Sequence, residues 1–211
     1  MRNIFLGEEH PDTITAMSDL AITYDSLGKC VDAEKLQIQV LDMKKKLLGE
    51  EHSGTITAMS NLARTYQQLG KDVDAEKLQI EVLNLRNRLL GKEHSDTISA
   101  MNNLAVTYQN LAKYTDAENL QIQILDMTNQ LLGEEHPDTI TAMNNLVIIY
   151  ERLGKYGAAE KLKIENLNVE SGLLGEEYSK SVKALLGSIR SQGNINISGA
   201  ESKQRGEFYQ L

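Results

Sequence analysis

One octapeptide recurs along this chain at a fixed interval. Copies of LGEEHPDT, intact or slightly altered, begin at Leu6, Leu48, Leu90, Leu132 and, as LGEEYSKS, at Leu174. All histidines of the chain occupy its fifth position and stand 42 residues apart: His10, His52, His94 and His136. A constant period of this length indicates an array of structural units, each of which packs on its neighbours.

Each period contains two stretches with the apolar spacing of a helix. Residues 12–27 have this spacing and are followed by Gly28, where a left-handed C-terminal cap is expected. Residues 31–48 have it as well, with Leu47 and Leu48 on the apolar stripe, and Gly49 follows. Strand-like alternation is absent. The pattern predicts antiparallel helix pairs, helix A and helix B, in an all-α solenoid.

The period also predicts the boundaries of a single array over 1–211. The expected units are an incomplete repeat at 1–11, full repeats at 12–53, 54–95, 96–137 and 138–179, and a degenerate fifth helix pair or cap at 180–211. Two interpretations stay open for residues 191–211, a packed cap and a flexible tail. The incomplete first unit fits either a fragment of a larger protein or an array that starts with a partial repeat. Glycines between the helices argue against one long coiled coil.

The spacing within one repeat resembles a known family. The motif Leu20-Ala21-x-x-Tyr24-x-x-Leu27-Gly28-Lys29, followed by Ala33-Glu34, resembles the tetratricopeptide repeat. The 42-residue period, the octapeptide and Asn102-Asn103-Leu104-Ala105 are similar to the kinesin light chain type. Arrays in fungal and bacterial receptor-type proteins with NB-ARC or NACHT domains are also similar. The resemblance implies a right-handed superhelix, helix A on its concave side, and a scaffold for protein–protein interaction.

Composition limits the partners that such an array is expected to have. The chain has 41% hydrophobic and 25% charged residues and a formal net charge of −8, which argues against binding to nucleic acid phosphates. No stretch approaches about 20 consecutive apolar residues, so we expect no membrane insertion. The single cysteine, Cys30, fits a reducing compartment, and we expect a cytoplasmic protein with a protein or peptide ligand.

A histidine beside acidic residues suggests a metal or acid–base site, but the repeat geometry opposes this interpretation. Helices pack about 8–10 Å apart, so equivalent histidines should lie too far from one another to share a zinc ion. Pro or Ser after the histidine, followed by Asp12, Asp96 or Asp138, is typical of a helix start. Gly54 replaces the aspartate in one copy. We therefore predict no enzyme activity, no metal and no cofactor.

The polar face of helix A differs between repeats, while its apolar face barely changes. Amide side chains donate and accept, and so satisfy an extended peptide backbone of any sequence. By resemblance, Asn61, Asn103 and Asn145 match the asparagine that grips ligand backbone in related peptide-binding repeats, although Asp19 replaces it in the first repeat. The predicted peptide-binding groove comprises Asn61, Arg64, Gln67, Gln68, Asn102, Asn103, Gln109, Asn110, Asn144, Asn145 and Arg152.

The resemblance does not extend to two known specificities. Chaperone-tail binders carry lysines on helix A, and this chain instead has Thr15, Thr57, Ser99 and Thr141 there. The basic cargo groove of the light chains is in doubt, because Asp19, Asp25 and Glu151 offset Arg64 and Arg152. Three alternatives to peptide binding remain open: a merely solvated polar face, self-association through the array ends, and a regulatory array within a larger nucleotide-binding receptor.

Overall fold

The computed structural model describes residues 7, 10–172 and 175 of the chain. Two compact units are present, Met1–Asn166 and Leu167–Leu211, and each is described by itself. The first unit is helical wherever it has regular structure in the described residues. Its helices are α1 (Pro11–Ser26), α2 (Cys30–Leu48), α3 (Ser53–Gln68), α4 (Asp72–Leu90), α5 (Ser95–Asn110), α6 (Tyr114–Leu132) and α7 (Pro137–Arg152).

Residues 156–166 of the first unit are helical as well, and in the second unit the described residues 167–172 and 175 are helical. The predicted fifth helix pair at 180–211 lies outside the described residues. So does most of the predicted incomplete repeat at 1–11. The choice between a cap and a tail therefore stays a prediction.

The octapeptide builds the start of every odd-numbered helix. In each copy the imidazole Nδ1 of the histidine accepts the backbone N–H two residues later, at 3.0–3.2 Å: His10, His52, His94 and His136. The threonine hydroxyl donates to the glycine carbonyl six residues earlier, as from Thr97 to Gly91 at 2.8 Å. The imidazole bond satisfies an N–H that the helix start leaves unpaired, and the threonine bond ties the first turn to the preceding glycine. The sequence predicted a helix start here, but not the imidazole as its cap.

The glycine after each helix permits the turn to the next one. Gly28, Gly70 and Gly154 have φ of 73°, 70° and 72°. A residue with a Cβ atom is strained in this left-handed region, so glycine is favoured there. The third repeat places Ala112 at the same position, with φ of 56°.

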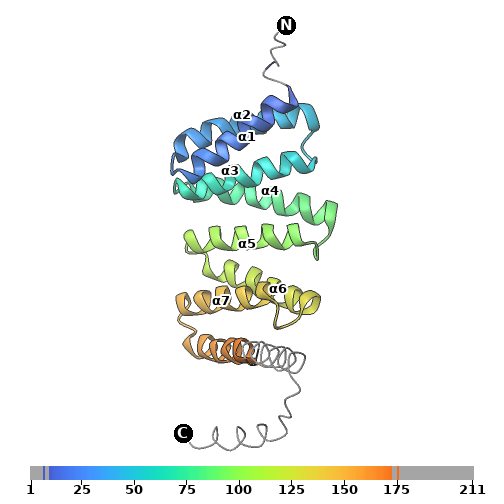
Figure 1. The fold of residues 1–211 in the computed structure, drawn as a ribbon. Helices are drawn as coiled ribbons and strands as arrows, with labels where there is room; N and C mark the ends of the chain where they lie inside the picture. The colour runs from blue at the N-terminus through green and yellow to red at the C-terminus, as the bar shows by residue number, and fades with distance from the viewer. Residues whose placement is uncertain (1–6, 8–9, 173–174, 176–211) are drawn as a thin grey trace, which may run out of the picture. The chain divides into compact units, whose positions relative to one another are not determined.

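The helices of the first unit pack in chain order to form an α-solenoid (Figure 1). Each helix contacts the next, and α1 also contacts α3. Fully buried alanines, such as Ala63 in α3 and Ala75 in α4, let neighbouring backbones approach closely. The predicted core stripe is buried in the central repeats, where Leu62 and Leu104 are 3% exposed. Leu20, at the same position of the first repeat, is 44% exposed.

An ion pair between neighbouring repeats recurs with the same period. Lys113 Nζ donates to both carboxylate oxygens of Glu76, at 2.6 and 2.7 Å, and lies 5.7 Å from the ring centroid of Tyr108. Equivalent pairs join Lys71 to Glu34 and Lys155 to Glu118. The hydrogen bond to Glu76 is the chief reason why the pKa of Lys113 is raised. This lysine therefore links neighbouring repeats within the array.

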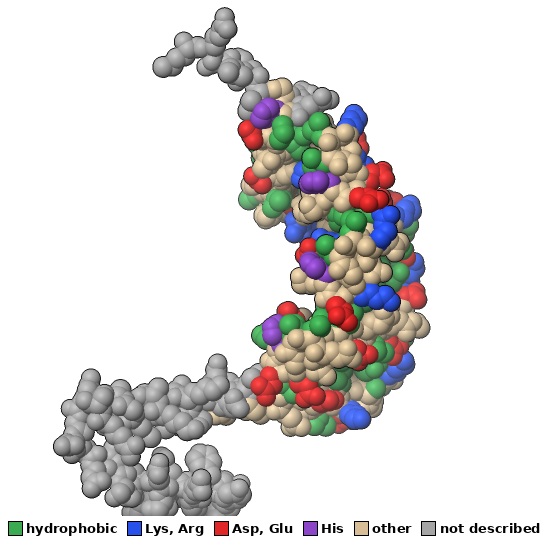
Figure 2. Space-filling model, turned by 90° about the vertical axis from the view of Figure 1, so that its right-hand side faces the viewer, with side chains coloured by type: hydrophobic (Ala, Val, Ile, Leu, Met, Phe, Trp, Pro, Cys, Tyr) green, Lys and Arg blue, Asp and Glu red, His purple; other side chains and the backbone are tan. Residues whose placement is uncertain are grey.

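The described surface of the first unit is hollowed on one side. Figure 2 shows the histidine side chains in a row along this hollow side. Because the histidines cap α1, α3, α5 and α7, the odd-numbered helices line the hollow.

Candidate functional site

Three asparagines at one repeat position form the centre of the predicted site. Asn61 on α3 and Asn145 on α7 are half-buried, and Asn103 on α5 is exposed. Their side-chain amides form no hydrogen bond with any residue that the structure describes. We call Asn61, Asn103 and Asn145 the asparagine row. Its amides are free to bond to a ligand.

Arg64, in contrast, is engaged with a buried acid of the preceding repeat. Its Nε lies 3.3 Å from Oδ2 of Asp25, and the hydroxyl of Thr65 donates to Oδ1 of the same carboxylate at 3.1 Å. Asp25 is only 6% exposed. Because a buried carboxylate requires a partner, Arg64 serves the fold and is not a free cation for an acidic ligand.

Gln67 belongs to a second polar link between repeats. Its Nε2 donates to Oγ1 of Thr107 at 2.7 Å, and that hydroxyl donates in turn to Oε1 of the buried Gln79. The chain of bonds joins α3, α5 and α4. At the position equivalent to Thr107, α7 carries the fully buried Ile149, so this link does not recur there.

Three further predicted residues also bond to neighbouring elements. Gln68 Oε1 lies 3.4 Å from the thiol of Cys30, and Asn110 Nδ2 donates to Asp72 at 2.9 Å. Asn144 Oδ1 accepts from Asn166 Nδ2 at 2.8 Å. Since Gln68 and Asn110 share one repeat position, their bonds form a recurring link between helices α3 and α5 and the even-numbered helices before them.

The remaining predicted residues are Asn102, Gln109 and Arg152. In the part of the chain that the structure describes, no side-chain hydrogen bond or ion pair involves them. Sequence periodicity placed all eleven predicted residues on the odd-numbered helices, as observed. It did not predict which of them form hydrogen bonds or ion pairs between repeats.

An apolar column runs beside the asparagine row. Val106 on α5 and Ile148 on α7 are 47% and 46% exposed, and Ile22 on α1 is 38% exposed at the same repeat position. Val106 and Ile148 stand three positions after Asn103 and Asn145, so they share the row's face of the helix, whereas α3 carries Arg64 at this position. The face therefore offers amide groups for a backbone and apolar contacts for side chains.

The described residues offer neither a metal cluster nor a membrane-spanning helix. No cluster of three or more His, Cys, Asp or Glu side chains that could hold a metal ion occurs among them. No helix in the same residues has both the length and the apolarity needed to cross a membrane.

Known proteins are similar to this chain in sequence pattern and in fold. The family model for the tetratricopeptide repeat matches residues 26–78, 55–121 and 96–164, which together cover more than half of the chain. A search of curated proteins finds no match.

Solved structures with the same fold include two at about one-quarter identity. A candidate kinesin light chain of Podosopora anserina with nearly identical TPR-like repeats is 26% identical, with a TM-score of 0.73, and 79% of each chain is covered. BtubC (BKLC) from P. vanneervenii is 26% identical, with a TM-score of 0.70, over 77% of this chain and 65% of that one. A Rap protein in complex with Competence and Sporulation Factor is 15% identical, with a TM-score of 0.62, over 79% and 44%.

Proposed function

This chain belongs to the tetratricopeptide repeat family, whose arrays generally mediate protein–protein interaction, and from that premise we propose that it is a non-catalytic scaffold. The proposed ligand is an extended peptide or a helical segment held along the hollow side by α3, α5 and α7. The observation that carries the proposal is the asparagine row, in which one amide recurs on successive odd-numbered helices without a partner among the described residues.

Helix spacing supports an extended ligand of the polyproline II type in particular. Packed helices lie about 8–10 Å apart, and three residues of such a chain, which make one turn, span about 9 Å. An amide at this interval meets a backbone carbonyl and N–H in every third residue of such a ligand. Because each amide both donates and accepts, it binds backbone irrespective of side-chain identity.

The neighbouring residues limit the sequence of the ligand. Val106 and Ile148 favour apolar ligand side chains at about every third residue. Because Arg64 is paired with Asp25, Arg152 is the one arginine of the predicted groove without an ion-pair partner among the described residues, which is little positive charge for an acidic peptide. The preferred ligand is therefore apolar and neutral or basic, unlike the acidic peptides of the basic light-chain groove.

A peptide array tests the proposal. The wild-type chain is screened against random peptides, and each binder is measured again with the double variant Asn103→Ala and Asn145→Ala. A matched control replaces Asn84 and Asn129, exposed asparagines on α4 and α6, with alanine. We expect the row variant to weaken binding at least tenfold and the control to leave it unchanged. Binders that are equally insensitive to both variants would refute the proposal.

Two alternative functions are self-association and a regulatory role within a larger receptor. No contact among the described residues favours either of them. Light scattering of the chain over a wide concentration range distinguishes the first from peptide binding. A mass that rises with concentration supports self-association, and a constant monomer mass argues against it.

A further inference from the structure

A row of three equivalent cavities lies where one repeat meets the next. Each is bounded by the first turn of an odd-numbered helix, the last turn of the following even-numbered helix and the first turn of the next odd-numbered helix. The cavities measure about 380 Å³ at α1–α2–α3, 230 Å³ at α3–α4–α5 and 220 Å³ at α5–α6–α7. We call them the cavity row. It lies in the N-terminal halves of the odd-numbered helices and does not include the asparagine row, although Asn102 and Ala142 of its lining come within one turn of Asn103 and Asn145.

The walls of the cavities are apolar at the same repeat positions. Each contains one isoleucine of an odd-numbered helix and a pair of leucines at the end of an even-numbered helix: Ile14 with Leu47 and Leu48, Ile56 with Leu89 and Leu90, Ile98 with Leu131 and Leu132. The sequence pattern placed these leucines on the core stripe, but all six are 44–49% exposed. Packing within the described residues therefore does not explain why a leucine pair recurs at the end of these even-numbered helices.

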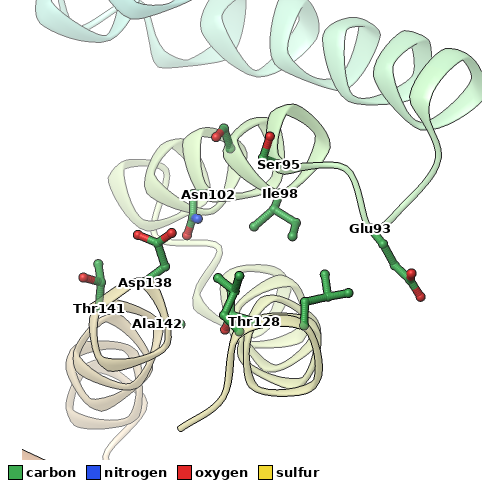
Figure 3. A pocket seen from close by; sticks show the side chains of 11 residues that line it. Glu93, Ser95, Ile98, Asn102, Thr128, Asp138, Thr141 and Ala142 are labelled. Carbon is green, nitrogen blue, oxygen red and sulfur yellow. The ribbon is translucent and has the colours of Figure 1, made fainter. Parts of the chain in front are cut away.

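The cavity at α5–α6–α7 combines this apolar surface with negative charge. Figure 3 shows Asp138 and Glu93 at opposite ends of the cavity, with Ile98 between them. No lysine or arginine lines it, and among the described residues neither acid forms an ion pair with a lysine or arginine. His136 Nδ1 lies 3.7 Å from Asp138 Oδ2, but it accepts the backbone N–H of Asp138 and therefore carries no proton. The N-terminal ends of α5 and α7 offset only part of this charge.

The other two cavities are less acidic. Arg86 lines the cavity at α3–α4–α5 and donates to the backbone oxygen of Asp96 at 2.7 Å, while Glu51 pairs with Arg88 at 2.8 Å. The cavity at α1–α2–α3 contains Lys44, and Gly54 stands where the other two have an aspartate. The row is thus apolar throughout and becomes acidic toward α7.

We propose that the cavity row binds a basic, apolar segment of a partner protein. Large apolar side chains of the segment occupy successive cavities, and one lysine or arginine lies beside Asp138 and another beside Glu93. Alternate helices lie about 10 Å apart, and in a polyproline II chain every third side chain points to the same side at intervals of about 9 Å, so the segment carries an apolar residue at every third position. This strip is separate from the asparagine row and does not depend on it.

Fluorescence anisotropy with labelled peptides tests the inference on the full chain. The probe LKKLKKL has the proposed pattern, AKKAKKA keeps its charge without the apolar side chains, and LEELEEL keeps these side chains with the opposite charge. We expect LKKLKKL to bind at least tenfold more tightly than either control peptide. Equal binding of LKKLKKL and AKKAKKA would mean that net charge alone is recognised and would overturn the proposal, as would equal binding of LEELEEL.

Matched variants locate the binding. Asp138→Asn should weaken the binding of LKKLKKL at least threefold. Asp12→Asn, at the same repeat position but in none of the three cavities, should leave the affinity unchanged. Gly54→Asp should strengthen binding, and the fold should accept it because Asp96 and Asp138 occupy the same position in later repeats. Circular dichroism checks that each variant is folded.

LKKLKKL also has the pattern proposed for the asparagine row, so the Asn103→Ala and Asn145→Ala double variant is needed to separate the two proposals. In that background the row cannot hold the peptide, and adding Asp138→Asn should still weaken the binding of LKKLKKL at least threefold. Loss of LKKLKKL binding in the double variant, together with an unchanged affinity in Asp138→Asn alone, would overturn the cavity proposal and leave the asparagine row standing.

Discussion

Two of the three buried glutamines at one repeat position, Gln37, Gln79 and Gln121, give a sharp test of the packing between repeats. Gln37 and Gln79 are each 4% exposed. Oε1 of Gln79 accepts the hydroxyl of Thr107, whereas neither amide atom of Gln37 has a hydrogen-bond partner among the described residues. Methionine has a similar length and no polar hydrogen-bonding requirement. The same substitution, glutamine to methionine, should therefore have opposite consequences at the two positions.

The expected magnitudes follow from these contacts. A buried amide without a partner costs about 1–3 kcal/mol, so Gln37→Met should raise the free energy of unfolding by about that amount. Gln79→Met removes a hydrogen bond worth about 1 kcal/mol. The carbonyl of Asn103, 3.3 Å from the Thr107 hydroxyl, remains as an acceptor and limits the loss. We expect Gln79→Met to lower the free energy of unfolding by at most about 1 kcal/mol, and hence the two variants to differ in this free energy by about 2 kcal/mol.

Urea unfolding followed by circular dichroism measures both variants against the wild type. The slopes must be compared together with the midpoints, because an array of repeats can depart from two-state unfolding. In a thermal scan, each kcal/mol corresponds to about 2–4 °C for a chain of this size. Equal stabilisation by both substitutions, or destabilisation by Gln37→Met, would refute the reasoning from unsatisfied burial.

The remaining predictions concern helix ends and the ion pair between repeats. His94→Ala should lower the free energy of unfolding by about 1 kcal/mol in urea, whereas His94→Asn, which keeps a capping acceptor, should not. Ala112→Gly should raise the thermal midpoint, because it relieves about 1 kcal/mol of left-handed strain. The raised pKa of Lys113 means that its pair with Glu76 stabilises the fold below the ordinary lysine pKa near 10.4 and loses this effect as the pH rises through the raised value. In unfolding experiments above about pH 10, the wild type should therefore lose more stability than Glu76→Gln; a parallel decline in both would contradict this.

The repeat period was sufficient to predict the fold. Constant spacing of His10, His52, His94 and His136 requires identical units, and the apolar spacing within one unit requires helices. The octapeptide was correctly interpreted as a helix stop and a helix start. Histidine is not among the preferred capping residues, however, so its repeated position alone could not reveal the bond from its Nδ1.

The candidate site was predictable only in part, because its members pair across repeats. The sequence shows Asp25 and Arg64 as variable residues on one polar face, but their contact depends on how far apart α1 and α3 lie. The same limitation applies to Leu131 and Leu132. Helical spacing places them on an apolar stripe, whereas the turn into α7 leaves them exposed at the edge of a cavity.

The central claim, that the asparagine row holds a ligand backbone, is tested most directly by nuclear magnetic resonance. The ¹⁵N-labelled chain is titrated with a peptide from the array while the side-chain NH₂ signals of the asparagines are followed. We expect the signals of Asn61, Asn103 and Asn145 to shift together at saturation, and those of Asn84 and Asn129 on the even-numbered helices to stay in place. A bound peptide that shifts the signals of Asn84 and Asn129 and leaves the row unchanged would contradict it.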